Sequence, residues 1–178
     1  MILGNNFGFE GGSVSGGGSG YDPCFGSFYD TTIQEAELDS PTAMKLNNTD
    51  VSCTSGVSIV NDLNGNPTLI TVSKAGVYNL QFSAQLYRIA EGNPQYIDIW
   101  LRKMNVNVPD SDTKLSMNAN GVYLLAAWNW LVNLNVNEYV QIMWAVSDNN
   151  IQLRYEPENI TTPHPAIPSV IATIQKIN

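Results

Sequence analysis

The chain has 178 residues, 43% of them hydrophobic, so it can bury a sizeable core as one structured domain with an appendage. Its net charge of −8 argues against a nucleic-acid partner, because such binding depends on Lys and Arg side chains that neutralise phosphates. The same charge argues against an anionic membrane surface, and no apolar run approaches the ~20 residues that a membrane helix needs.

Residues 1–23 differ in composition from everything after them. Gly11–Gly20 reads GGSVSGGGSG, which is typical of a flexible coil with an end-to-end distance of roughly 17–19 Å. Four apolar residues precede this coil: Ile2, Leu3, Phe7 and Phe9. They favour either a docking peptide on a tether or a disordered tail, and both interpretations stay open. The N-terminus lacks the basic region of a secretory signal. We expect a tether over 1–23 and a folded domain over 24–178.

Short strand candidates separated by turn signals begin after Cys24. The first are Phe25–Thr32, Ala43–Leu46, Gly56–Val60 and Leu69–Val72. The clearest candidate follows, because apolar and polar residues alternate strictly in the segment YNLQFSAQL. Its apolar positions are Tyr78, Leu80, Phe82, Ala84 and Leu86. A period of two predicts a strand with one buried face, and that face needs a second sheet to cover it.

Strand patterns continue to the end of the chain. The further candidates are Tyr96–Lys103, Gly121–Leu134, Tyr139–Ser147, Ile151–Tyr155 and Ser169–Ile177. Residues 105–120 are polar and are expected to form a loop, while 156–168 carries four prolines and is expected to be a loop or a sheet edge. No segment predicts a convincing helix. About ten short strands without helices indicate two packed antiparallel sheets, as in a sandwich or jelly roll.

The four tryptophans divide into two groups. Trp128, Trp130 and Trp144 lie on uniformly apolar faces of their strands and are predicted to be core residues. Trp100 instead shares its face with three more polar residues, Tyr96, Asp98 and Arg102. Such a face can stack a sugar or be covered by a neighbouring chain. We favour the neighbouring chain, with Tyr96, Trp100 and Arg102 as the contact residues.

The sequence offers no recognisable catalytic, cofactor or metal site. His164 stands between two prolines, without the nucleophile and orienting partner that a catalytic base requires. Cys24, Cys53 and His164 lack the close spacing of zinc ligands, and free thiols are favoured over a disulfide. Asp110 and Asp112 have no following Gly or Glu of a calcium loop, so a solvated turn is favoured over a Ca²⁺ site. We expect no enzymatic activity.

Several segments resemble jelly-roll proteins encoded by tailed bacteriophages. These are SFYDTTIQ (27–34), ITVSKAGVYNLQFSAQL (70–86), IWLRKMNVNVPDS (99–111), VNEYVQIMWAVSDNNIQLRYEP (136–157) and HPAIPSVIATIQKI (164–177). By pattern, such proteins belong to the superfamily of tumour necrosis factor and the globular heads of complement, and Gly76-Val77-Tyr78 is similar to its G-x-Y signature. One departure is Met104-Asn105, which stands where the phage pattern has Asn-Gly; Asn105 can still adopt the positive φ of that turn.

The resemblance implies a ten-stranded antiparallel jelly roll, a homotrimer with a threefold axis and no enzymatic activity. It also implies a virion part, such as a head fibre or capsid decoration protein, assembled in the host cytoplasm and joined to other virion proteins. The resulting hypothesis is a trimeric head anchored by the tail through Ile2, Leu3, Phe7 and Phe9. A glycan-binding fibre or tail knob that recognises the host is the alternative. A polysaccharide hydrolase would need paired carboxylates, and no such pair is recognisable.

Overall fold

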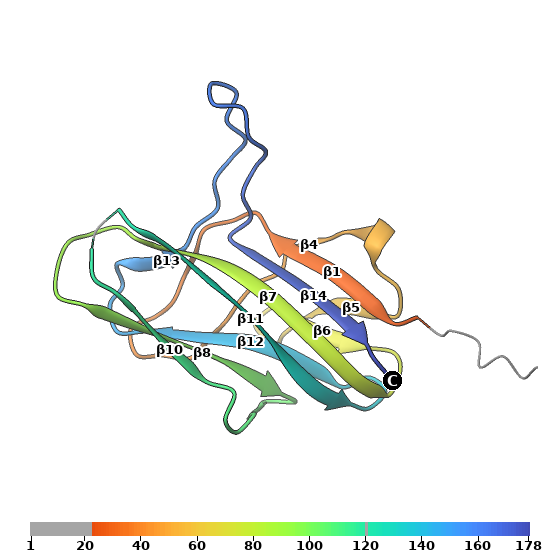
Figure 1. Cartoon of the computed structure of the whole chain (residues 1–178). Helices are drawn as coiled ribbons and strands as arrows, with labels where there is room; N and C mark the ends of the chain where they lie inside the picture. The colour runs from red at the N-terminus through yellow and green to blue at the C-terminus, as the bar shows by residue number, and fades with distance from the viewer. Residues whose placement is uncertain (1–22, 120) are drawn as a thin grey trace, which may run out of the picture.

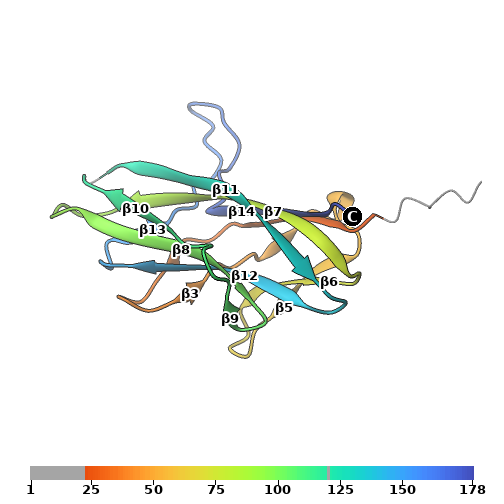
Figure 2. The ribbon, with the colours of Figure 1, turned by 60° about the horizontal axis from the view of Figure 1, so that its bottom comes forward.

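Two antiparallel β-sheets pack face to face in the computed structural model, which describes residues 23–119 and 121–178 (Figures 1 and 2). Sheet A contains β1 (Phe25–Asp30), β2 (Gln34–Glu35), β4 (Asn48–Thr49), β7 (Gly76–Arg88), β11 (Tyr123–Leu134), β13 (Ile151–Leu153) and β14 (Val170–Lys176). Sheet B contains β3 (Thr42–Ala43), β5 (Val57–Asn61), β6 (Pro67–Val72), β8 (Gln95–Lys103), β9 (Val106–Asn107), β10 (Thr113–Met117) and β12 (Tyr139–Val146).

The predicted fold class, an all-β antiparallel jelly roll, is confirmed. Of the fourteen strands in the described residues, ten have three residues or more and four have only two. The only helical element there is a single 3₁₀ turn, η1 (Val51–Cys53), where Asp50 caps the first turn by accepting from the Ser52 amide. The domain boundary at Cys24 stays a prediction, because residues 1–22 lie outside the described part of the chain.

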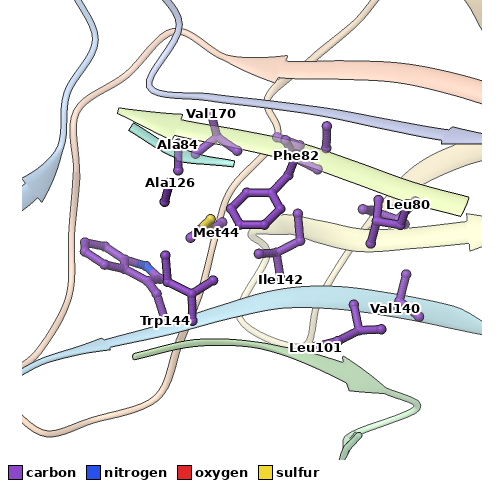
Figure 3. Close-up of a cluster of buried hydrophobic side chains, with 14 of the residues drawn as sticks. Met44, Leu80, Phe82, Ala84, Leu101, Ala126, Val140, Ile142, Trp144 and Val170 are labelled. Atoms are coloured by element: carbon purple, nitrogen blue, oxygen red, sulfur yellow. The ribbon is translucent and has the colours of Figure 1, made fainter. Parts of the chain in front are cut away.

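Sheet A is built around β7, the longest strand described. Along one of its edges β7 pairs with β14 and then β13, and along the other with β11 over twelve residue pairs. Its inward positions are all buried, as the alternation predicts: Tyr78, Leu80, Phe82, Ala84 and Leu86. They meet side chains of β12 and β8 from sheet B, including Ile142, Trp144 and Leu101 (Figure 3). The core therefore lies between β7 and β12.

Both ends of β7 are fixed by buried polar side chains. Near its start, the Tyr78 hydroxyl donates to the Lys74 carbonyl over 2.7 Å. At its end, the fully buried Arg88 donates through its two terminal nitrogens to the carbonyls of Met117 and Asn93, each over 2.8 Å. A buried guanidinium must be hydrogen-bonded to be tolerated, so Arg88 fixes the loops on either side of it.

Two expectations about short segments are wrong in part, and two short strands were not expected. Residues 105–120, expected to be a loop, contain β9 and β10, and β10 pairs only with β8 at the edge of sheet B. Only Ala43 of the expected strand Ala43–Leu46 is in β3. The two-residue β2 and β4 were not expected. Strands this short depend on a partner distant in sequence, and local alternation carries no signal for them.

The turn after β8 confirms the expectation for Asn105. Asn105 has a φ of +63° and Met104 a φ of +47°, so both central residues of the β8–β9 turn are left-handed. This is the geometry that an Asn-Gly pair provides most easily in a two-residue hairpin turn. The turn is kept although a methionine occupies a conformation that favours Asn or Gly.

The predicted inward face of β11 is confirmed, with a correction for two tryptophans. Trp128 and Trp130 face inward but are only partly buried, whereas Trp144 on β12 is fully buried. Trp128 and Trp130 both pack on Phe82. The Trp130 ring is stacked on it at 5.1 Å and the Trp128 ring lies edge-on at 4.7 Å, measured between ring centroids. They are half covered because β11 is an edge strand of sheet A, where the sandwich is open on one side.

Replacing Trp144 with Ala should lower the free energy of unfolding by about 3–5 kcal/mol, since it empties the largest fully buried side-chain volume described in the core. Trp144→Phe should lower it less, because the indole Nε1 is buried without a hydrogen-bond partner in the described residues and its removal leaves nothing newly unpaired. Urea unfolding at one fixed protein concentration measures both. A loss below ~1 kcal/mol for Trp144→Ala would mean that β12 presents its other face to the core.

Candidate functional site

The outward side of sheet A carries no charged side chain on its four long strands. These strands point successive residues to opposite sides, so one set lines the core and the other faces outward. We call this outward set the charge-free face: Phe25, Ser27 and Tyr29 of β1, Val77, Asn79, Gln81, Ser83, Gln85 and Tyr87 of β7, Tyr123, Leu125, Ala127, Asn129, Leu131 and Asn133 of β11, and Ile171, Thr173 and Gln175 of β14. The chain has 24 Asp, Glu, Lys and Arg residues, and none occupies these positions.

Large apolar side chains are exposed on the charge-free face. Leu131 is 65% exposed and Leu125 56%, and Tyr123 and Ile171 are exposed as well. The polar residues between them are neutral amides and hydroxyls, and two of these amides, Asn129 and Asn79, are hydrogen-bonded to each other over 3.0 Å. Depletion of charge together with exposed aliphatic and aromatic groups is the composition of an interface core between proteins.

The outward side of sheet B has a different character. Asp98 of β8 and Lys114 of β10 form an ion pair of 3.2 Å there, and the Lys114 ammonium lies 5.6 Å from the centre of the Tyr96 ring. Arg102 lies on the same side and donates through Nε to Asn107 over 3.3 Å. This side therefore carries paired charges and hydrogen-bonded polar groups, in contrast to the charge-free face.

Of the predicted contact residues, Trp100 has a setting that the sequence did not reveal. Its side chain is only 9% exposed, and its indole N–H donates to the Asn107 side-chain oxygen over 2.9 Å. The chain after β8 folds back over this tryptophan, so its own loop covers most of the surface assigned to a neighbour. Tyr96 is 48% exposed and Arg102 is half-buried, and for these two the partner contact stays a prediction.

A second feature on the same side as the charge-free face is a proline-rich hairpin, residues 154–168, which we call the arm. It follows β13, stands away from the sandwich and returns into β14 (Figures 1 and 2). A cavity of about 560 Å³ separates it from the sheet, with Gln85 and Tyr123 on the sheet side and Ile160 and His164 on the arm side. Residues 156–168, expected to be a loop or a sheet edge, contain no named strand and form this hairpin through two isolated β-bridges.

The base of the arm is tied to the charge-free face through Glu156. The Tyr123 hydroxyl donates to Glu156 Oε1, and Arg154 Nε donates to the same oxygen over 2.8 Å. The Arg154 guanidinium also lies 5.3 Å from the centre of the Tyr87 ring. These two donors lower the pKa of Glu156, while burial and the bond to Glu156 raise the pKa of the Tyr123 phenol. The network therefore keeps Glu156 charged and Tyr123 protonated at neutral pH.

The remaining candidates from the sequence have simple settings. His164 is exposed and its Nδ1 lies 2.8 Å from the Pro165 carbonyl oxygen, with no nucleophile among its contacts in the described residues. Cys24 and Cys53 are free thiols, the first buried and the second exposed. Asp110 and Asp112 are exposed, and no cluster of three or more His, Cys, Asp or Glu side chains in residues 23–119 and 121–178 could hold a metal ion.

The tail residues Ile2, Leu3, Phe7 and Phe9 lie outside the described residues, so their anchoring role stays a prediction. In the described part of the chain, no helix is long and apolar enough to span a membrane.

Comparison with solved structures identifies proteins of similar fold. The chain is similar to murine APRIL at pH 5.0, with a TM-score of 0.56 and 10% identity over 88% of this chain and 100% of that one. It is also similar to Eiger TNF from S. frugiperda, with a TM-score of 0.53 and 8% identity over 88% and 93% of the two chains. The chain has a tumour-necrosis-factor-like jelly-roll fold. No family model and no curated protein matches it at the level of sequence.

Proposed function

We propose that this protein is a non-enzymatic homotrimer whose copies pack through the charge-free face of sheet A. The observation that carries the proposal is the absence of charge from every outward position of β1, β7, β11 and β14 in a chain of net charge −8. Proteins with the tumour-necrosis-factor or complement-head fold typically form homotrimers, which supports three copies rather than two.

The energetics of this face favour burial. Removing Leu125, Leu131, Tyr123 and Ile171 from water is favourable at roughly 25 cal/mol for each Å² of apolar surface. Burial of an unpaired charge would oppose association by several kcal/mol. The charges that touch this face, Arg154 against Tyr87 and Glu156 against Tyr123, are paired with each other. The neutral Asn, Gln, Ser and Thr side chains can donate and accept hydrogen bonds across an interface at a much smaller desolvation penalty.

Two measurements test the trimer: the mass of the wild-type protein, and the mass of a variant with one charge placed in the proposed interface. The wild-type protein at micromolar concentration should scatter light as three times 19.5 kDa. Leu131→Asp should give a folded monomer, because Leu131 is exposed in the single chain yet would bury a charge in the assembly. Val60→Asp is the matched control, since Val60 is exposed on β5 of sheet B, and it should leave the trimer unchanged. A trimeric Leu131→Asp protein would contradict the proposed interface.

For the biological setting, the proposal is a virion structural protein, either a head fibre or a capsid decoration protein of a tailed phage. Its support is the sequence resemblance of residues 136–157 and 164–177 to phage jelly rolls. Residues 1–23 would tether the trimeric head to another virion protein, after assembly in the host cytoplasm. The glycan-binding alternative has less support, since Trp100, its stacking residue, is almost covered by its own chain.

Deletion of residues 1–20 tests the tether. The truncated protein should remain a folded trimer, because β1 begins at Phe25, and it should no longer be incorporated into particles. Incorporation is measured by quantifying the protein in purified particles, with the full-length chain as reference. Three tethers in one trimer raise the effective concentration of the anchor, so single substitutions in the tail are a weaker test than the deletion. Normal incorporation of the truncated protein would mean that the folded head makes the attachment.

A further inference from the structure

The arm is a stiff hairpin rather than a slack loop. Glu156 and Ile167 exchange two backbone hydrogen bonds of 3.0 and 2.8 Å, and Asn159 and His164 exchange two more of 3.2 Å each. At the tip, the Asn159 side-chain oxygen accepts from the amides of Thr161 and Thr162. Four prolines fix φ along the arm, at positions 157, 163, 165 and 168. A segment held in this way loses little conformational entropy when it binds.

The arm also has an apolar tip that its own chain leaves uncovered. Ile160 is 88% exposed, although it is among the large aliphatic side chains that usually find cover. The cavity of about 560 Å³ extends from Arg154 and Glu156 at the base to Ile160 and His164 near the tip, so the arm does not lie down on its own sheet. The Tyr123, Arg154 and Glu156 network fixes the base in this raised position.

The direction of the arm ties it to the proposed trimer. The cavity beneath it is lined by Gln85 and Tyr123, which are outward residues of the charge-free face, so the arm rises on that side of sheet A. Figure 2 shows it above the layer that contains β7, β11 and β14. In a trimer that buries the charge-free face of each copy against a neighbour, an arm raised at the border of that face points toward the neighbouring copy.

We propose that the arm is a clasp between copies of this chain. It contacts a neighbouring copy, buries Ile160 against that copy and encloses part of it in the cavity beneath the arm. This inference rests on the proposed trimer and adds a second contact to it. The neighbouring copy covers the apolar tip of the arm. Because the arm is already held in one conformation, it loses little conformational entropy when it makes this contact.

Ile160→Asp tests the clasp, with Leu63→Asp as the matched control. Leu63 is also a fully exposed aliphatic residue at a tip, but that tip is the β5–β6 turn of sheet B. The dissociation of each trimer is followed by sedimentation over a range of concentrations. Ile160→Asp should weaken association by about tenfold or more, as expected when a buried aliphatic side chain is replaced by a charge. Leu63→Asp should stay within about twofold of wild type. Both residues are exposed in the single chain, so both variants should fold.

Hydrogen exchange of the arm gives an independent readout. The amides from Asn159 to His164 should exchange more slowly in the wild-type trimer than in the monomeric Leu131→Asp protein. The arm is intact in both chains, so local hairpin stability alone would give equal exchange.

The outcomes separate the two proposals. If Leu131→Asp dissociates the trimer while Ile160→Asp behaves like Leu63→Asp, the clasp is overturned and the trimer stands. Equal exchange of the arm amides in trimer and monomer would overturn the clasp as well. A monomeric wild-type protein would overturn both. Weakened association by Ile160→Asp together with protected arm amides supports the clasp.

Discussion

Each residue position of β7 must satisfy one of two environments, because a strand directs successive side chains to opposite sides of its sheet. Sheet B covers the inward side, where Tyr78, Leu80, Phe82, Ala84 and Leu86 meet the side chains of β12. The outward side is the constraint on which the rest of the structure depends. It has the neutral composition of an interface core, and in the described residues Arg154 and Glu156 lie against it at Tyr87 and Tyr123.

The distribution of charge follows from that constraint. Charged residues occur on the outward side of sheet B, where Asp98 pairs with Lys114, and on the arm, where Arg154 pairs with Glu156. At the border of the charge-free face, Arg154 and Glu156 pair with each other, and Glu156 joins the base of the arm to Tyr123. A face that is neutral throughout and an arm that rises beside it are explained together by a neighbouring copy of the same chain.

Strict local alternation made much of the fold predictable. It gave β7 with its buried face and the positions of β12 and β14, and it placed Trp144 in the core correctly. It did not reveal that Trp100 is covered, because the segment over this residue comes from later in the chain and only the folded geometry brings it there. It also overstated the burial of Trp128 and Trp130, since alternation gives the direction of a side chain but not whether its strand lies at an edge.

The candidate site was less accessible to sequence reasoning. Each of the four strands shows neutral outward positions when it is read alone, yet only the pairing of β1, β14, β7 and β11 reveals that they form one continuous face. The prolines of residues 156–168 predicted a loop, and they do not reveal that it is a raised hairpin on that face. Both features depend on contacts between segments far apart in the chain, which local patterns do not encode.

Hydroxyl-radical footprinting of the native protein at micromolar concentration tests the central claim most directly, with Leu131 and Leu63 compared in the same sample. The two residues have the same side chain, so they share one intrinsic reactivity, and both are exposed in the single chain. If copies of the chain cover the charge-free face, Leu131 should be oxidised several-fold more slowly than Leu63. Oxidation of Leu131 at the rate of Leu63 would show that the face is open to water and would contradict the account.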